Sequence, residues 1–359
     1  MHTTNLFVIG GFLGAGKTTT MLALARRLTA DGHTVGIITN DQTDNLVDTQ
    51  LAEQIGATVE EVTGSCFCCN YPTFAEKISQ LRHCDYILAE PVGSCTDLAS
   101  TIMRPTQQGR AGEIRLFPLT VLIEPQRLEA LIADTDLSLG IHYIMDKQLE
   151  EADFILLNKV DTLTNDAQSQ MLDTLCNHYP KATVMAISAQ IGDGLQDWLA
   201  AVTAADSALS GNKQIDVIYE TYGKAEADMG WLNARGTIQS NDAIDGNSLI
   251  YDLSEAIRDT LSKHQKLIGH LKIALKTDIG LSKLSCVNTA EPSAFDEKLN
   301  TSVTQGELTI NLRALEEPEA LRDTAESALK VACEKAGANV NGLIIDAFKP
   351  GFPNPTYRL

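Results

Sequence analysis

The chain has 359 residues, of which 44% are hydrophobic and 21% are charged, so it is long enough for two domains and has the composition of a folded globular protein. Its formal net charge of −19 argues against nucleic acids and anionic membranes as partners, because both surfaces repel a strongly acidic molecule. No stretch approaches the ~20 apolar residues that cross a bilayer, and the first residues lack the basic flank and cleavage site of an export signal, so we expect a cytoplasmic protein.

Apolar runs alternate with helical patterns through the first two hundred residues. The runs are LFVI (6–9), VGIIT (35–39), YILA (86–89), LTVLI (119–123), FILL (154–157) and TVMAI (183–187). An apolar stripe with helical spacing begins after Lys17, and Gly32 stands where a helix C-cap is expected. Short strands that are apolar on both faces and separated by helices are typical of a parallel sheet. We therefore predict an α/β domain whose parallel sheet is flanked by helices.

The pattern loosens after residue 202 into a small, polar stretch, which indicates a linker between domains. We predict a first domain over 1–207, a linker over 208–228 and a second domain over 229–359. In the second domain, strands are expected at 231–239, 270–276, 281–287, 307–315 and 343–346, and helices at 249–268 and 318–336. This order favours a smaller α+β domain with two helices on one side of an antiparallel sheet.

The first strand leads into GGFLGAGKTTT, which matches the phosphate-binding pattern G-x-x-x-x-G-K-[ST] between a predicted strand and a predicted helix. A glycine-rich backbone lets N–H groups face phosphate oxygens, while Lys17 is expected at the β and γ phosphates and Thr18 at Mg²⁺. A glycine-rich turn without a ligand is the alternative. The nucleotide-contacting residues that the pattern predicts are Gly11, Gly14, Ala15, Gly16, Lys17, Thr18 and Thr19. The segment is thus expected to be a P-loop.

Three of the eight cysteines, Cys66, Cys68 and Cys69, lie close together in a predicted strand-to-helix loop. Thiolates at this spacing suit Zn²⁺ or another borderline divalent ion such as Co²⁺. A fourth ligand is missing from the motif, and Glu60, Glu61, water or a partner's side chain could supply it. Two other interpretations stay open: buried cysteines that pack as small hydrophobic residues, and a redox pair. The remaining cysteines are expected in the core without chemistry; they are Cys84, Cys95, Cys176, Cys286 and Cys333.

The run FILL is followed by NKVD, a guanine-reading pattern made of Asn158, Lys159 and Asp161. The Asp161 carboxylate can accept from the ring N–H and the exocyclic amine of guanine, whereas adenine offers no such donor pair. An exposed turn at a strand end is the alternative for so short a motif. Ser188 and Ala189, in ISAQIGDGL, are expected in a backbone loop that stacks on the base. Together with the P-loop, this motif predicts GTP rather than ATP as the ligand.

Four segments carry a resemblance to a known family. They are GGFLGAGKTTT, CFCC, EPVG and EEADFILLNKVD, and in this order they resemble the CobW-type (cobalamin synthesis protein-like) metallochaperone GTPases, relatives of the UreG, HypB and MeaB GTPases. The resemblance implies that Glu90 helps to hold Mg²⁺, that the amide of Gly93 faces the γ-phosphate, and that Asp41 positions the attacking water. Otherwise Glu90 would be a solvated strand-end carboxylate and Asp41 a helix cap or turn residue. With Lys17, these three are the expected catalytic residues.

The resemblance implies a protein that binds and hydrolyses GTP, takes up a divalent metal through its Cys-x-Cys-Cys motif, and delivers it to a client metalloenzyme or corrinoid protein. No arginine or glutamine finger can be identified, so hydrolysis is expected to be slow until a partner or a nucleotide-dependent homodimer accelerates it. One alternative is a GTPase chaperone that gates cofactor loading and whose cysteines are structural. Another is a small-molecule kinase, against which NKVD argues. The chain departs from the family at Glu124, where an aspartate is usual, and in its C-terminal third, so the client stays open.

Overall fold

The computed structural model describes residues 3–40, 57–62, 65–133, 138–205, 211 and 213–359. The chain divides into two compact units. Unit 1 comprises Met1–Tyr222 and Pro353–Leu359, and unit 2 comprises Gly223–Phe352. Unit 2 is therefore an insertion, after which the chain returns to unit 1, whereas we expected the second domain to continue to residue 359.

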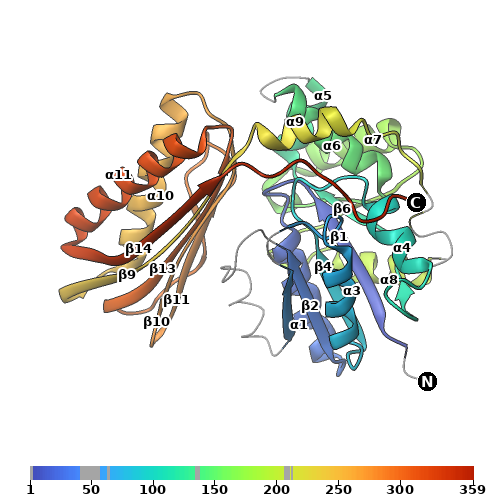
Figure 1. The fold of residues 1–359 in the computed structure, drawn as a ribbon, viewed down its shortest axis with the longest axis horizontal. Helices are drawn as coiled ribbons and strands as arrows, with labels where there is room; N and C mark the ends of the chain where they lie inside the picture. Colours follow the sequence, from blue (N-terminus) through green and yellow to red (C-terminus); the bar gives the residue numbers. More distant parts are fainter. Residues whose placement is uncertain (1–2, 41–56, 63–64, 134–137, 206–210, 212) are drawn as a thin grey trace. The chain divides into compact units, whose positions relative to one another are not determined.

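Unit 1 is built on a parallel sheet, as the alternating apolar runs predict (Figure 1). Its strands are β1 (Asn5–Gly11), β2 (Val35–Asn40), β3 (Thr58–Val62), β4 (Tyr86–Glu90), β5 (Arg115–Leu116), β6 (Thr120–Ile123), β7 (Phe154–Leu157) and β8 (Thr183–Ala186). They lie in the order β3-β2-β4-β1-β6-β7-β8, and β5 pairs with β1. The described pairings are parallel, so the strands' carboxyl ends share one edge. The residues of the nucleotide and cysteine motifs follow that edge.

Helices connect these strands, and two more, α8 (Leu195–Ala204) and α9 (Tyr219–Ala227), follow the last of them and lead towards unit 2. The connecting helices are α1 (Lys17–Ala30), α3 (Tyr71–Gln80), α4 (Arg104–Gln107), α5 (Pro125–Ala133), α6 (Leu139–Glu151) and α7 (Asn165–His178), with a π-helical turn η1 (Ala99–Met103) and a 3₁₀ turn η2 (Val160–Thr162). α1 begins at Lys17, as expected, and buries its apolar stripe. On α7 the prediction for Cys176 is wrong: it is exposed, because Leu175 and Met171 mark the buried face and the next residue is turned away by about 100°.

Unit 2 is an antiparallel sheet with two helices on one side, as predicted (Figure 1). Its elements are β9 (Gly230–Ile244), α10 (Gly246–Lys263), β10 (Ile268–Thr277), β11 (Gly280–Cys286), β12 (Ala294–Glu297), β13 (Val303–Ala314), α11 (Pro318–Ala336) and β14 (Ala338–Phe348), with strand order β12-β11-β10-β13-β9-β14. The helix expected at 249–268 begins earlier, because Asp245 accepts from the N–H groups of Asn247 and Ser248. It also ends earlier, since Ile268 already pairs with Ala314 in the sheet.

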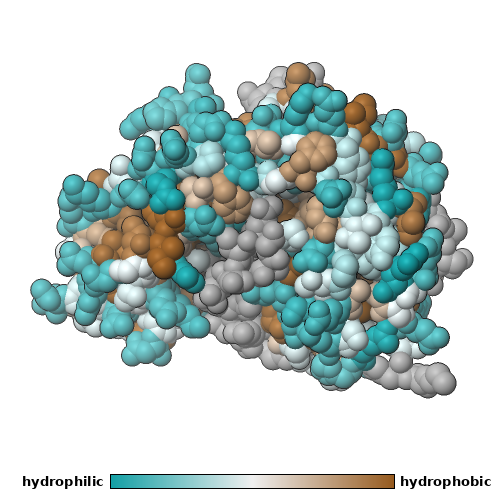
Figure 2. Space-filling view, in the orientation of Figure 1, coloured by the Kyte–Doolittle hydropathy of each residue, from teal (hydrophilic) through white to brown (hydrophobic). Residues whose placement is uncertain are grey.

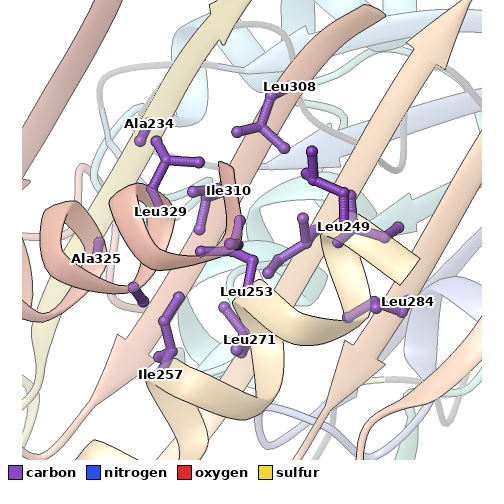
Figure 3. Close-up of a cluster of buried hydrophobic side chains, with 14 of the residues drawn as sticks. Ala234, Leu249, Leu253, Ile257, Leu271, Leu284, Leu308, Ile310, Ala325 and Leu329 are labelled. Atoms are coloured by element: carbon purple, nitrogen blue, oxygen red, sulfur yellow. The ribbon is translucent and has the colours of Figure 1, made fainter. Parts of the chain in front are cut away.

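The core of unit 2 lies between its helices and its sheet (Figure 3). Leu253 and Ile257 of α10 and Leu329 of α11 are buried against strand residues such as Leu271 and Ile310. Each such side chain contributes about 1.5–3 kcal/mol by leaving water. Unit 2 thus has a hydrophobic core of its own.

Hydrophilic residues dominate the face in Figure 2, and hydrophobic residues gather there in small patches. None of the helices within the described ranges is both long enough and apolar enough to cross a membrane.

Candidate nucleotide and metal site

The P-loop lies between β1 and α1. Lys17 is 6% exposed, and its Nζ donates to the backbone oxygen of Phe12 at 3.3 Å, across the loop. Gly16, which precedes the helix, has a φ of 92°, and a Cβ there would lie 2.2 Å from Nδ2 of Asn158. Glycine is therefore required at this position for both its conformation and its lack of a side chain.

Glu90, the last residue of β4, meets the start of α1. The Thr18 hydroxyl donates to Oε1 of Glu90 at 3.1 Å, and Nζ of Lys17 lies 3.9 Å from the same oxygen. The structure brings these three predicted residues together because β4 is the direct neighbour of β1 in the sheet. A hydroxyl and a carboxylate are hard oxygen donors of the kind that Mg²⁺ takes, so the pair fits this ion.

Gly93 passes directly against the P-loop. A Cβ at this position would lie 2.7 Å from Cδ2 of Leu13, 3.0 Å from its backbone nitrogen and 3.0 Å from Nζ of Lys17. No side chain fits there, which explains the glycine of EPVG in packing terms. Main-chain atoms of the segment after β4 thus lie beside the lysine that is expected at the phosphates.

Gln148, on α6, holds this segment in place, and the sequence analysis missed it. Its Nε2 donates to the backbone oxygens of Gly93 at 3.0 Å and Cys95 at 2.8 Å, and the side chain is 2% exposed. An amide provides two donors, and both are used here. One turn further along α6, an oxygen of the buried Glu151 carboxyl group accepts from the backbone N–H of Ala99 at 2.9 Å.

The NKVD motif also contacts the P-loop. Nδ2 of Asn158 donates to the backbone oxygen of Ala15 at 2.9 Å, and its Oδ1 accepts from the N–H of Ala189 at 3.0 Å. The exposed Asp161 accepts from the Ser188 hydroxyl at 2.6 Å, which fixes the orientation of its carboxylate. Asn158 therefore ties together the two loops that are expected to hold the phosphates and the base.

Glu124, where the sequence departs from the family pattern, has a local structural role. Its carboxylate accepts from the backbone N–H groups of Gln126 at 3.3 Å and Arg127 at 3.2 Å. These are donors of the first turn of α5 that helix geometry leaves without a partner. The residue stabilises the beginning of that helix.

The cysteine cluster differs from the motif that the sequence suggests. The Sγ atoms of Cys66 and Cys68 are 2.7 Å apart, and together with Sγ of Cys95 they form a group whose members all lie within 4.8 Å of one another. Cys95, which we expected to be a core residue without chemistry, is indeed buried at 1% exposure, but its sulfur also lies within this group. β3, which precedes the motif, and β4, which precedes Cys95, both flank β2, so the loops after them meet.

Cys69, the third cysteine of the motif, lies outside this group. Its Sγ is 3.9 Å from that of Cys68, and it accepts a hydrogen bond from the N–H of Asn354 at 3.2 Å. Neither of the carboxylates considered as a fourth ligand belongs to the group found among the described residues; Glu60 instead pairs with Lys77 at 2.8 Å. The Cys69 thiol therefore faces the last segment of the chain.

Hydrogen bonding within the cluster separates the acidities of its thiols. Contacts with the thiols of Cys68 and Cys69 lower the pKa of Cys66 well below its usual range. The hydrogen bond to Cys66 raises the pKa of Cys68, and likewise raises that of Cys69 to about 11. The lowered pKa of Cys66 favours its thiolate, which is the form that binds metals.

Asn40, at the end of β2, shapes the cysteine loop. Its Nδ2 donates to the backbone oxygens of Val62 and Ser65, both at 2.9 Å, and its Oδ1 accepts from the N–H of Phe67 at 2.7 Å. One side chain thus satisfies three main-chain groups next to Cys66. The sequence gives no signal for this role, and Asp41, the next residue and an expected catalytic one, lies outside the described residues.

The segment Pro353–Leu359 packs on the cysteine motif within unit 1. The N–H of Thr356 donates to the backbone oxygen of Cys68 at 2.8 Å, and its hydroxyl donates to that of Cys69 at 3.1 Å. The next residue, Tyr357, meets Tyr71 edge-on with ring centroids 5.3 Å apart. The end of the described chain is thus part of the cysteine site.

Comparison with known proteins identifies relatives of this chain. A curated relative, the zinc chaperone CobW of Pseudomonas aeruginosa, is 26% identical over 218 residues, which cover 52% of this chain and 56% of the relative. The chain thus spans little more than half the length of that protein.

Solved structures of similar fold include the hydrogenase maturation factor HypB from Archaeoglobus fulgidus and the Zn(II)-bound YjiA GTPase from E. coli. HypB is 16% identical, with a TM-score of 0.41, and the match covers 56% of this chain and 89% of HypB. YjiA is 15% identical, with a TM-score of 0.37, and the match covers 91% of this chain and 99% of YjiA.

The assignment rests on the sequence of unit 1. Residues 5–186 match the model of the CobW/HypB/UreG nucleotide-binding domain, and they hold both the P-loop and the four clustered cysteines. The match spans just over half of the 359 residues, and the chain belongs to the CobW/HypB/UreG family.

Proposed function

We propose that the protein binds and hydrolyses GTP, holds a divalent metal, zinc or cobalt, through its clustered cysteines, and delivers it to a client metalloenzyme or corrinoid protein. The proposal rests on the path of the segment from Gly93 to Cys95, which links the two sites. Gly93 lies against Leu13 and Lys17 of the P-loop, and two residues later Cys95 joins Cys66 and Cys68. A structural change at the phosphates can therefore be transmitted to the thiols through a short stretch of backbone.

The nucleotide half of the proposal follows from the residues around the P-loop. Backbone N–H groups of the loop and Lys17 would neutralise the phosphates, and Thr18 and Glu90 would hold Mg²⁺, which supplies further charge neutralisation when bound. Asp161, oriented by Ser188, would accept from the guanine edge. Asp41 stays a prediction as the residue that positions water, and we propose slow hydrolysis that a partner or a second copy of the chain accelerates.

The metal half of the proposal is supported by the chemistry of the donors. Thiolates suit zinc, and cobalt(II) takes similar ligands, so the physiological ion depends on availability as much as on affinity. The relative from Pseudomonas aeruginosa is a zinc chaperone, which favours zinc. Because the match covers little more than half of that relative, delivery to a client rests on the experiment below.

The test is metal release coupled to GTP. Reduced protein is loaded with zinc, freed of excess metal and mixed with GTP and Mg²⁺ in the presence of a chromogenic zinc chelator, while phosphate release is followed in parallel. We expect zinc transfer to the chelator to change with GTP in the wild type. Lys17→Ala, which loses the phosphate-binding cation, should release zinc at the same rate with and without nucleotide. Zinc release from the wild type that ignores GTP would contradict the coupling.

A second candidate function is favoured by the burial of the thiols. Cys68 and Cys95 are 3% and 1% exposed, as in a structural zinc site that never releases its metal. The protein would then be a GTPase chaperone that gates cofactor loading into a corrinoid or metal enzyme. Stoichiometric zinc that resists chelation in every nucleotide state would favour this function over metal delivery.

A further inference from the structure

We infer that Cys95 is a ligand of the transported metal, so that the ion lies among Cys66, Cys68 and Cys95, and that Cys69 is the outer thiol through which the ion is exchanged. The inference rests on the proposed function and deepens it. It changes the ligand set that the Cys-x-Cys-Cys motif alone suggests.

Distances between the sulfur atoms favour this set. A tetrahedral zinc ion with Zn–S bonds of about 2.3 Å holds its sulfur ligands about 3.8 Å apart. The sulfur atoms of Cys66, Cys68 and Cys95 all lie within 4.8 Å of one another, so shifts of about an ångström would bring them to that spacing. Among the described residues, these three are the potential metal ligands whose donor atoms all lie this close to one another, and Cys69 is not one of them.

The surroundings of the two competing thiols also differ. Cys95 is 1% exposed, and Gln148 fixes its backbone oxygen at 2.8 Å, so its position is determined by the core of unit 1. Cys69 is half-buried, and its sulfur accepts a hydrogen bond from the N–H of Asn354. An enclosed ligand suits retention of the ion, whereas a half-buried ligand next to the cluster suits its passage to another molecule.

This ligand set gives the nucleotide a direct mechanical route to the metal. Gly93 contacts the P-loop, and Gln148 binds the backbone oxygens of Gly93 and Cys95 with a single amide nitrogen. A displacement of Gly93 by a γ-phosphate would therefore move Cys95 relative to Cys66 and Cys68. The affinity for the metal should depend on which nucleotide is bound, and the dependence should require the Cys95 thiol.

The experiment compares Cys95→Ala, Cys69→Ala and a control, Cys84→Ala, in the full chain under reducing conditions. Cys84 is also buried at 1% exposure but lies outside the group. Zinc affinity is measured by competition with a chelator, with GDP and with a non-hydrolysable GTP analogue. Sulfur ligands are counted by X-ray absorption at the zinc edge.

We expect Cys95→Ala to weaken zinc binding by more than about 100-fold, because even groups that only support a ligand are worth 10–100-fold. It should also abolish the difference between the two nucleotides. Cys69→Ala should keep three sulfur ligands and slow the transfer of zinc to the chelator. Cys84→Ala should match the wild type in affinity, nucleotide response and sulfur count.

The outcomes separate this inference from the proposed function. A wild-type protein that binds no zinc would overturn both. If the wild type binds zinc but Cys69→Ala retains only two sulfur ligands, the metal site is the sequence motif itself and the inference alone is overturned. The same holds if folded Cys95→Ala, verified by its unchanged GDP affinity, binds zinc as tightly as the wild type.

Discussion

Arg358 and Asp97 form an ion pair, with Nε of the arginine 2.9 Å from Oδ2 of the aspartate, although 261 residues separate them in the chain. The same carboxylate oxygen accepts from the Tyr219 hydroxyl at 2.9 Å. Tyr219 precedes unit 2 and Arg358 follows it, while Asp97 lies two residues after Cys95. One buried carboxylate therefore holds the chain on both sides of the insertion, beside the cysteine cluster.

Arg358→Ala should lower the free energy of unfolding of unit 1 by about 2 kcal/mol. Asp97 is fully buried and would lose its charged partner, but Arg358 is 47% exposed, so the cost stays below the 3–5 kcal/mol of a wholly buried pair. Urea unfolding followed by circular dichroism measures the change. Arg110→Ala is the matched control, because Arg110 contacts the same segment through the Tyr357 ring at 5.0 Å, a contact worth about 0.5–1 kcal/mol. Equal losses in the two variants would refute a special role for the ion pair.

Gln148→Leu should destabilise the segment between the P-loop and the cysteines. The substitution keeps the volume but leaves the backbone oxygens of Gly93 and Cys95 buried without this donor, at about 1–3 kcal/mol for each group. We expect a lower melting temperature and weaker GTP binding, both measured on the same preparation. Gln170→Leu, on the exposed side of α7, should change neither quantity, and a wild-type GTP affinity in Gln148→Leu would show that the segment positions itself without the glutamine.

Asp161→Ala should remove the preference for guanine. The carboxylate, which accepts from the Ser188 hydroxyl at 2.6 Å, is the acceptor proposed for the guanine edge. A site built around such a hydrogen bond discriminates by a factor of about 10⁴ against a ligand that cannot form it. We expect GTP affinity to fall by at least about 100-fold while ATP affinity stays at its low wild-type value, as measured by calorimetric titration of each nucleotide. A parallel loss for both nucleotides would point instead to a collapse of the loop.

Because of Glu151, the free energy of unfolding should decrease as the pH rises. Burial raises the pKa of this carboxyl from 4.5 to about 8, so the folded protein holds a proton that the unfolded chain releases above about pH 4.5. The stability that this proton provides is complete below pH 4.5 and is lost as the pH rises towards 8, with a slope of up to about 1.4 kcal/mol per pH unit. Urea unfolding between pH 5 and 8 should show this slope in the wild type and a flatter one in Glu151→Gln. Glu150→Gln, at the exposed neighbouring position, should retain the wild-type slope.

Much of the fold could be predicted because local pattern and final structure agree. FILL forms β7, and the helix expected at 318–336 is α11, each with the expected bounds. The period and the length of the apolar pattern determine such elements. The P-loop and NKVD could be recognised from residue types, spacing and the predicted strands that precede them, and their roles in nucleotide binding stay predictions. Thr18 and Glu90, predicted as a pair only through the family resemblance, do meet in the structure.

The contributions of Cys95, Gln148 and Asn40 could not be predicted, for a common reason. Each depends on strand order, which places the loops after β3 and β4 on either side of the end of β2, and sequence periodicity does not specify that order. A cysteine two residues after EPVG was a visible signal, but burial among apolar neighbours was the simpler interpretation. The return of Pro353–Leu359 to unit 1 could not be predicted either, because its partners, such as Cys69 and Asp97, lie more than 250 residues earlier in the chain and no local pattern specifies such contacts.

The insertion of unit 2 ahead of the segment that packs on the cysteines sets an order of events during synthesis. Asn354 follows Cys69 by 285 residues, so at a translation rate of 5–20 residues per second a ribosome adds it about 15–60 s later. For that interval the nascent chain lacks the hydrogen bond from Asn354 to the Cys69 sulfur and those from Thr356 to the backbone oxygens of Cys68 and Cys69. A newly made chain therefore passes through a period in which its cysteines are more open to metal ions and to oxidants than they are in the finished protein.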